Sequence, residues 1–287
     1  MSSAPLPPCT ARRSDSLQRV AIDPSNILLT GRVAVVTGGG EGIGRGIAEG
    51  LTAFGASVTI WERNPDTCAS AAEAIGALGI VTDVRDSEQV DVAVARTATE
   101  LGIPSILVNN AGGVFSSPLL DTSENGWDAL YRSNLRHVLL CTQRVARRLV
   151  NAGQAGSIIN VTSIEGARAA PGYAAYAAAK AGVINYTKTA ALELAPHKIR
   201  VNALAPDLTV TEGLLRMSPD GLSPNMGHMI PMGRPGYVDE MAGAAVFLAS
   251  DMSSYITGQT IHVDGGTQAA SGWYHNPQTG EYQLGPG

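Results

Sequence analysis

Short runs of apolar, mostly β-branched residues alternate with longer alanine-rich stretches from residue 31 onward, and this alternation most constrains the fold. Each run is too short for a core helix and lacks the polar alternation of a half-exposed strand, so it predicts a strand buried on both faces. Such an alternation predicts an α/β chain with a single doubly wound parallel sheet and helices on both faces. The predicted strands cover 33–36, 58–60, 80–81, 106–108, 157–161, 199–201 and 260–263, and the predicted helices 44–54, 87–101, 127–151, 173–194 and 239–249.

Three segments fall outside this alternation. Residues 1–29 are polar and proline-containing, and we expect a flexible N-terminal tail ahead of one domain over 30–266. Residues 207–235 are rich in Pro, Gly and Met and long for a connection, so they predict a lid. Residues 267–287 form a C-terminal extension that contains Trp273, Tyr274 and Tyr282. These aromatic residues lead us to expect that the extension docks on its own subunit or on a neighbour.

Composition excludes several classes of function. The formal net charge of −5 disfavours nucleic acid and anionic membranes as partners. No uninterrupted apolar run reaches the ~18 residues of a spanning helix, and the first residues lack the apolar core of a secretory signal, so we expect a cytoplasmic protein. The three cysteines, Cys9, Cys68 and Cys141, are too far apart for a metal-ligand pattern, and we expect no metal.

A glycine-rich loop joins the first predicted strand to the first predicted helix. The loop runs from Thr37 through Gly38, Glu41, Gly42 and Ile43 to Gly44. Glycines at such a junction allow a tight turn and a close approach of backbone to a pyrophosphate, which the helix N-terminus also attracts. The loop therefore predicts dinucleotide binding on a Rossmann fold.

The end of the second predicted strand bears on the choice of dinucleotide. Glu62 lies about 20 residues beyond the glycine loop, where an acid can accept hydrogen bonds from the adenosine ribose. Glu41 adds a second negative charge, whereas the Arg63 guanidinium could bind a 2′-phosphate. Two carboxylates against one arginine favour NAD over NADP, with NADP use through Arg63 as the alternative.

Tyr176 and Lys180 are four residues apart in a predicted helix, which places both on one face. A nearby ammonium lowers the pKa of a tyrosine and makes it a better acid–base at neutral pH. Ser163 follows a predicted strand, at the sheet edge where open α/β folds bind ligands. Its hydroxyl could donate to a substrate carbonyl. Tyr173 competes as the acid–base but has no lysine four residues later.

Together these motifs resemble the classical short-chain dehydrogenase/reductase family, in its bacterial form, over residues 31–267. The resemblance rests on motifs in the family's order and spacing. They are Thr37-Gly38-x-x-x-Gly42-x-Gly44, Asp83-Val84, Asn109-Asn110-Ala111-Gly112, Asn134, Ser163, Tyr176-x-x-x-Lys180, Val201-Asn202-Ala203-x-Ala205-Pro206 and Val263-Asp264-Gly265-Gly266.

The resemblance implies a role for each matched position. Tyr176 would be the acid–base, Lys180 would lower its pKa and hold the nicotinamide ribose, Ser163 would orient the carbonyl, and Asn134 would keep a kinked helix and a water linked to Lys180. The remaining implied cofactor contacts are Gly38, Glu41, Gly42, Ile43, Gly44, Glu62, Arg63, Asp83, Val84, Asn110, Ala111, Gly112, Pro206, Thr209 and Thr211.

One residue departs from the family's pattern, and one further property follows from the resemblance. Asp207 stands where the family commonly has glycine, which adds a side chain beside the expected nicotinamide site. The family also implies a homotetramer through the helices matching 127–151 and 173–194, where Ala174, Ala175, Ala177, Ala178, Ala179 and Ala181 would allow close helix packing.

Apolar residues around the expected site suggest the substrate. Val114 and Phe115 follow the Asn-Ala-Gly motif, and the predicted lid carries Leu214, Leu215, Met217, Met226, Met229, Ile230 and Met232. Flexible methionines suit irregular apolar ligands. We therefore predict hydride transfer between NAD(H) and a hydrophobic secondary alcohol or ketone: a steroid, a terpenoid, a cyclic alcohol or an acyl thioester. The alternatives are an NADPH-dependent 3-oxoacyl-thioester reductase and a non-catalytic dinucleotide sensor.

Overall fold

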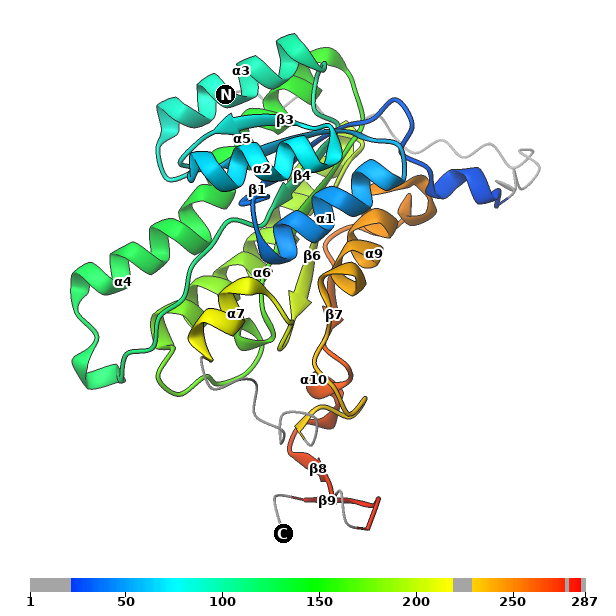
Figure 1. The fold of residues 1–287 in the computed structure, drawn as a ribbon. Helices are drawn as coiled ribbons and strands as arrows, with labels where there is room; N and C mark the ends of the chain where they lie inside the picture. The colour runs from blue at the N-terminus through cyan, green and yellow to red at the C-terminus, as the bar shows by residue number, and fades with distance from the viewer. Residues whose placement is uncertain (1–21, 219–228, 277–278, 285–287) are drawn as a thin grey trace.

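A seven-stranded parallel sheet forms the centre of the molecule (Figure 1). The structure is a computed structural model that describes residues 22–218, 229–276 and 279–284. The strand order is β3-β2-β1-β4-β5-β6-β7. The strands are β1 (Val33–Thr37), β2 (Ser57–Glu62), β3 (Leu78–Val81), β4 (Ile106–Asn109), β5 (Gly156–Val161), β6 (Ile199–Pro206) and β7 (Thr260–Val263). The doubly wound α/β fold is thereby confirmed, and each predicted strand lies within one of these.

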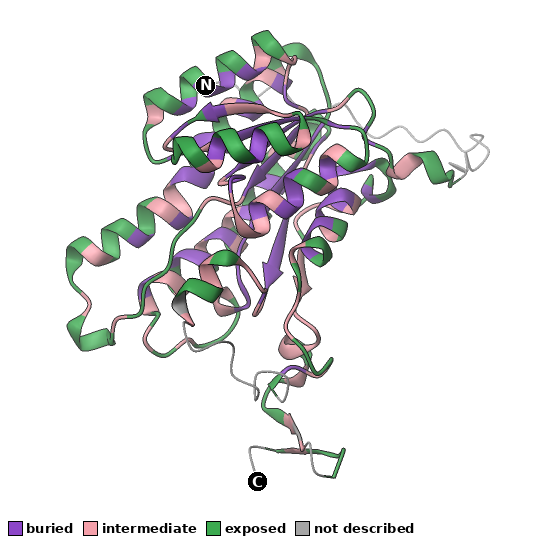
Figure 2. Cartoon of the chain, in the orientation of Figure 1, coloured by how far each residue is buried: buried purple, intermediate pink, exposed green. Residues whose placement is uncertain are grey.

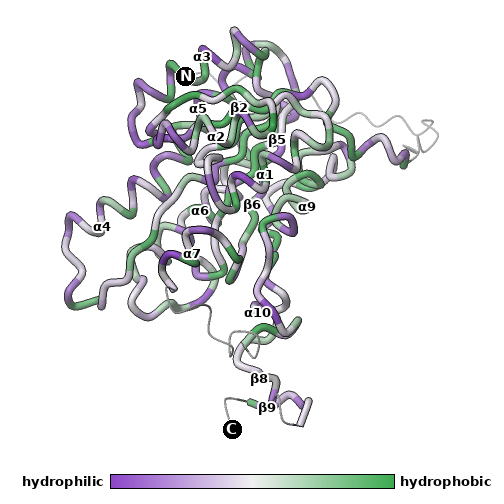
Figure 3. Tube along the Cα trace, in the orientation of Figure 1, coloured by the Kyte–Doolittle hydropathy of each residue, from purple (hydrophilic) through white to green (hydrophobic). Residues whose placement is uncertain are grey.

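Helices cover both faces of the sheet, and each face has its own apolar core (Figure 2). One core packs β-strand residues against α1 (Gly42–Ala53), α2 (Pro65–Ile75) and α9 (Val238–Ala249). The other packs them against α3 (Ser87–Glu100), α5 (His137–Ala152) and α6 (Ala174–Leu194). Figure 3 shows the hydrophobic parts of the trace concentrated along the central strands. Burial on both faces explains why the strands are continuous apolar runs.

The topological switch point lies between β1 and β4, where strand order reverses. Both strands end at the same edge of the sheet, with Val36 paired to Val108. The Thr37 hydroxyl oxygen accepts the backbone N–H groups of Asn110 and Ala111, each at 3.0 Å. The glycine loop and the Asn-Ala-Gly loop are thus held side by side where open α/β sheets bind ligands.

Two helical features differ from the predicted pattern. The structure has α2, which was not predicted, although Asn64 caps it through Asp66 N–H at 2.9 Å and Pro65 begins it. The single helix expected over 127–151 is instead α4 (Glu124–Tyr131), a π-helical turn (Arg132–Arg136) and α5. A π turn inserts an extra residue locally, and such turns are frequent at functional sites.

The two ends of the described chain differ in how they pack. Leu29 is fully buried in the core, although it belongs to the segment expected to be a flexible tail. Residues 1–21 of that segment lie outside the described residues. The C-terminal extension forms α10 (Thr267–Ala270) and a hairpin of β8 (Trp273–His275) and β9 (Tyr282–Leu284), which stands away from the body in Figure 1. Among the described helices, none has both the length and the hydropathy needed to cross a membrane.

Candidate active site

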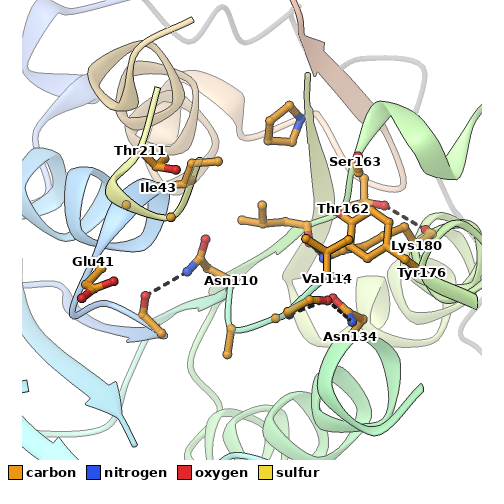
Figure 4. Close-up of a pocket in the computed structure, with 18 of the residues that line it drawn as sticks. Glu41, Ile43, Asn110, Val114, Asn134, Thr162, Ser163, Tyr176, Lys180 and Thr211 are labelled. Atoms are coloured by element: carbon orange, nitrogen blue, oxygen red, sulfur yellow. Dashed lines mark hydrogen bonds between the residues drawn. The ribbon is translucent and has the colours of Figure 1, made fainter. Parts of the chain in front are cut away.

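A pocket of about 760 Å³ opens at the carboxyl ends of the parallel strands. It extends from the glycine loop, past the Asn-Ala-Gly loop, to the helix that carries Tyr176 and Lys180 (Figure 4). In that view Glu41 lies at one end, and Ser163, Tyr176 and Lys180 gather at the other. The pocket thus brings together two sets of residues that lie more than 120 positions apart in the chain.

The glycine loop is shaped by backbone geometry that other residues would oppose. Gly38 and Gly42 have positive φ angles of 62° and 55°, which favour glycine. A Cβ on Gly44 would clash with the backbone of Gly38. Helix α1 begins at Gly42 and its N-cap, Glu41, makes no side-chain cap. The loop therefore leaves helix N–H groups directed at the pocket, as an anion site requires.

Asn134 holds the Asn-Ala-Gly loop against the π-helical turn. Its Nδ2 donates to the carbonyl oxygens of Gly113 (2.8 Å) and Leu130 (3.0 Å), and its side chain is fully buried. A Cβ on Gly112 would lie 2.8 Å from its Oδ1, so only glycine allows this close approach. The kinked helix that the resemblance implies is present here.

Tyr176 and Lys180 project from α6 into one corner of the pocket, beside Ser163 at the end of β5. The Lys180 Nζ lies 5.6 Å from the centre of the Tyr176 ring and donates to the Val161 carbonyl oxygen at 3.0 Å. Burial lowers the pKa of Lys180 to about 8. Burial also raises the pKa of Tyr176, an effect that the Ser163 hydroxyl opposes. We expected the ammonium to lower the tyrosine pKa, but the largest influence is burial, which raises it, so Tyr176 is protonated at neutral pH.

A charged cluster forms the outer rim of this corner. The Arg168 Nη2 lies 2.9 Å from Glu165 Oε1 and 3.5 Å from Asp207 Oδ1. The Asp207 side chain is only 8% exposed, so this residue faces the pocket rather than solvent. The two carboxylates and one guanidinium make the rim polar and net negative.

The predicted lid contributes polar residues to the pocket. Within the described part of 207–235, the lining residues are Asp207, Thr211, Gly213 and Arg216. The apolar wall expected from the lid is therefore absent from the described residues, where Met229 and Met232 are exposed and Ile230 is buried. Met226 lies outside the described residues.

Helix α7 (Glu212–Met217) bridges from this segment to the glycine loop. The Glu212 Oε2 accepts the Gly42 N–H at 3.1 Å, and Arg216 Nη2 lies 2.6 Å from Glu41 Oε2. The Glu212 carboxylate therefore occupies part of the anion site at the start of α1. The Glu41 charge, in turn, is paired.

A second cavity of about 380 Å³ continues the pocket beyond Glu62 and Arg63. Asp83 and Val84 line it, with Asp83 paired to Arg85, whose guanidinium lowers the pKa of the carboxyl. No ion pair engages Arg63 within the described residues, and its side chain is exposed at the junction of the two cavities. This end of the site thus offers one uncommitted guanidinium.

Most predicted site residues meet in the main pocket. Those lining it are Gly38, Glu41, Gly42, Ile43, Glu62, Arg63, Asn110, Ala111, Gly112, Asn134, Ser163, Tyr176, Lys180, Pro206 and Thr211. Asp83 and Val84 line the adjoining cavity. Gly44 shapes the loop from inside α1, and Thr209 is buried with its hydroxyl on the Asp207 carbonyl oxygen, so neither lines the pocket.

Sequence reasoning missed several lining residues. They are Asn64, Thr67, Gly113, Val161, Thr162, Gly213 and Arg216. Asn64 and Thr67 carried a usable signal, since a cap residue after the second strand marks the start of a helix at the ligand-binding edge. Arg216 carried none, because its partner Glu41 is 175 residues away.

The shape and chemistry of the site fit a dinucleotide. The volume suits a cofactor-sized ligand. The glycine turn and the start of α1 supply backbone donors for phosphates. The main pocket and the adjoining cavity together provide room for the two ends of such a ligand.

Comparison with known proteins gives consistent matches across most of the chain. A family model described as enoyl-(acyl carrier protein) reductase matches residues 38–268. The chain is 39% identical over 250 residues to a 3-oxoacyl-[acyl-carrier-protein] reductase of Chlamydia muridarum, covering 84% of this chain and 99% of the relative.

Solved structures agree with these sequence matches. A short-chain type dehydrogenase/reductase from Mycobacterium marinum is 35% identical with a TM-score of 0.80, covering 85% of this chain and 98% of the other. A gluconate 5-dehydrogenase from Burkholderia cenocepacia, solved in complex with NADP and tartrate, is 39% identical with a TM-score of 0.80, covering 86% and 98%.

The expected preference for NAD is wrong, because the comparisons favour NADP. The expectation counted Glu41 and Glu62 as two free charges against Arg63. In the structure Arg216 neutralises Glu41, and Glu62 accepts the Asn64 N–H at 3.1 Å. Glu62 and Arg63 both lack an ion pair among the described residues, so one carboxylate rather than two now stands beside the guanidinium, and a guanidinium suits a 2′-phosphate.

Proposed function

Since the chain belongs to the classical short-chain dehydrogenase/reductase family, we propose that it reduces the ketone of a 3-oxoacyl thioester with NADPH. It is an oxidoreductase. The observation that carries the proposal is the meeting of Ser163, Tyr176 and Lys180 in one pocket with the glycine loop. The name of the Chlamydia muridarum relative supports the thioester as substrate. The proposal thus takes up the predicted alternative, an NADPH-dependent 3-oxoacyl-thioester reductase, in place of the main prediction of an NAD(H)-dependent enzyme for a hydrophobic alcohol or ketone.

Four side chains divide the work on the substrate in this proposal. Tyr176, protonated at neutral pH, donates its proton to the carbonyl oxygen. Ser163 donates a hydrogen bond to the same oxygen and orients it. Lys180 stabilises the tyrosinate that results, and Asn134 positions the loop that faces them.

The glycine loop, the Asn-Ala-Gly loop and Arg63 would hold NADPH. Gly38, Gly42 and Ile43 face its phosphates, Asn110 and Gly112 its central part, and Arg63 the 2′-phosphate. When bound, NADPH supplies the hydride that reduces the carbonyl carbon.

A second candidate substrate is a polyhydroxy acid, of the kind named for the gluconate 5-dehydrogenase from Burkholderia cenocepacia. The specific observation in its favour is the charged rim. Glu165 and Asp207 offer acceptors for the hydroxyl groups of such a substrate. If the protein oxidises gluconate with NADP faster than it reduces a 3-oxoacyl thioester, the polyhydroxy acid becomes the preferred substrate class.

The test is NADPH oxidation with acetoacetyl thioesters, followed at 340 nm, in the unaltered protein and in Tyr176→Phe. We expect kcat to fall by about 10²–10⁴ in the variant, with the NADPH affinity retained. Tyr173→Phe is the matched control, because Tyr173 is the N-cap residue of the same helix, α6, but has no lysine four residues later. Turnover undiminished in Tyr176→Phe would refute the assigned acid. NADPH binding without turnover of any ketone would favour the sensor interpretation instead.

A homotetramer and a cytoplasmic location remain predictions of the sequence. The family's helices for subunit contact correspond here to α4, α5 and α6. Their exposed apolar residues support an interface.

A further inference from the structure

A separate cavity of about 470 Å³ lies between the charged rim and the C-terminal extension. One wall carries Arg168 and Met229, and the other carries Gln268, Ser271, Trp273 and Tyr274. The matched family region ends at residue 268, so most of the second wall belongs to a segment beyond it. This cavity is therefore built in large part from residues outside the matched family region.

Arg168 connects this cavity to the catalytic pocket. Its guanidinium lines the outer cavity and reaches Asp207 at 3.5 Å, which lines the inner pocket beside Pro206. It also pairs with Glu165, two residues after Ser163. The outer cavity and the catalytic pocket are therefore neighbours on the two sides of this rim.

The charges around Arg168 decide what the cavity accepts. Glu165, Asp207 and Asp264 are the carboxylates that act on it, and together they raise its pKa. Three negative charges near one guanidinium repel a phosphate or carboxylate group. Trp273 and Tyr274, in contrast, offer aromatic faces with polar edges, and Gln268 offers an amide. These groups suit a neutral chain with amides and short apolar stretches.

We propose that this cavity is an outer substrate site that binds the neutral, amide-bearing arm of a thioester substrate. The inference rests on the proposed thioester reduction and adds where the rest of that substrate lies. The C-terminal extension then serves as one wall of the site. Trp273 is half-exposed, at 51%, so part of its ring is open to the arm.

Three thioesters with the same acyl group test which part of the arm the cavity binds. Acetoacetyl-N-acetylcysteamine carries a truncated arm, acetoacetyl-pantetheine the whole neutral arm, and acetoacetyl-coenzyme A the arm with its phosphates. We expect kcat/KM to rise about tenfold from the first to the second, as one well-packed aromatic contact allows, and to gain nothing from the second to the third.

Variants assign that gain to the extension. Trp273→Ala, and a chain ending at Gly272, should each reduce the ratio of pantetheine to N-acetylcysteamine kcat/KM to near one. Trp273→Phe should keep most of the ratio. Tyr255→Ala removes a fully exposed aromatic residue ahead of β7 and should keep the ratio whole.

The outcomes distinguish the two proposals. The outer site is refuted if the ratio of pantetheine to N-acetylcysteamine kcat/KM is retained in Trp273→Ala and in the shortened chain. It is also refuted if kcat/KM rises only with the coenzyme A thioester. Thioester reduction stands in both cases. If the unaltered protein oxidises NADPH with none of the three thioesters, the proposed function itself fails.

Discussion

Lys180 is placed where its charge is useful to catalysis and costly to the fold. Its pKa is about 8 in the folded protein and about 10.5 in its ordinary state, so below pH 8 folding must bury a full ammonium. The free-energy cost of burying this charge is present in full below pH 8. It declines as the pH rises toward 10.5, where the unfolded chain also loses the proton. A lowered lysine pKa therefore makes this residue's contribution to stability more favourable with rising pH.

Lys180→Met tests this conflict. A shift of this size corresponds to about 3 kcal/mol, from which about 1 kcal/mol is subtracted because the Val161 carbonyl loses its donor. We expect the variant to be inactive yet about 2 kcal/mol more stable at pH 6, with the gain shrinking above pH 8. Chemical denaturation at pH 6 and pH 9.5 measures it. Equal or lower stability at pH 6 would contradict the burial argument.

Arg63 should decide which dinucleotide binds. Its guanidinium stands at the junction of the two cavities without an ion pair among the described residues. Charge-assisted hydrogen bonds to a phosphate contribute about 1.5–3 kcal/mol, so Arg63→Ala should weaken NADPH binding at least about tenfold and leave NADH nearly unchanged. Fluorescence titration with both cofactors gives the two dissociation constants.

The control for Arg63 is Arg45→Ala, since Arg45 pairs with Glu49 on α1 and does not line the pocket. Equal weakening of NADPH and NADH in Arg63→Ala would mean that the residue serves the adenine or the fold rather than the 2′-phosphate.

At the residue scale, what could be predicted depended on sequence separation. Tyr176 and Lys180 are linked by helix periodicity, so their meeting follows from spacing alone. Glu41 and Arg216 are 175 residues apart, and no local pattern brings them together. The error over NAD came from that pair, because Glu41 was counted as a free charge. Asp207 was singled out, but its ion pair with Arg168 needed the structure.

Helix α7 lies against the glycine loop, and its first residue occupies a backbone donor that the proposed cofactor would need. The Glu212 carboxylate accepts the Gly42 N–H at the start of α1, where a phosphate would bind. A carboxylate is both a strong acceptor and a charge that repels phosphate. Phosphate binding therefore requires Glu212 to leave this position.

Glu212→Gln should tighten NADPH binding. A neutral amide is a weaker acceptor by about 1 kcal/mol, so we expect the dissociation constant to fall about fivefold. Glu49→Gln removes a charge from the other end of α1 and should leave the affinity as it is. Weaker NADPH binding in Glu212→Gln would show instead that α7 holds the cofactor through this side chain.

The elements with the most deeply buried residues were the easiest to predict from the sequence. The five inner strands are largely buried, so their apolar runs stood out in the sequence, whereas the edge strands β3 and β7 are only partly buried. Helix α2 was missed because its buried residues, Cys68, Ala71 and Ala72, are small and give a weak periodic signal. The π-helical turn depends on Asn134 bonding across to Gly113, a contact 21 residues away that helical periodicity does not encode.

At the scale of the whole molecule, exposed apolar residues collect on the layer of α4, α5 and α6. Trp127, Tyr131 and Leu139 are 40–45% exposed, and Leu192 is 77% exposed. Apolar surface of this kind is typical of an interface between subunits. Of the alanines expected to pack against a neighbour, Ala175 and Ala179 are buried within their own subunit, whereas Ala178 and Ala181 are exposed.

Ala181→Arg is therefore the substitution that should disrupt the expected tetramer. Small exposed side chains let two helices approach to about 8–10 Å, and an arginine there brings bulk and a charge that the contact cannot hydrate. Light scattering after gel filtration should give a tetramer for the unaltered protein at micromolar concentration and a smaller species for the variant. Val92→Arg adds the same group to an exposed position on α3, which is not one of the helices expected in the interface, and should remain tetrameric. A monomer in the unaltered protein would refute the assembly, and a tetramer retained in Ala181→Arg would move the interface away from α6.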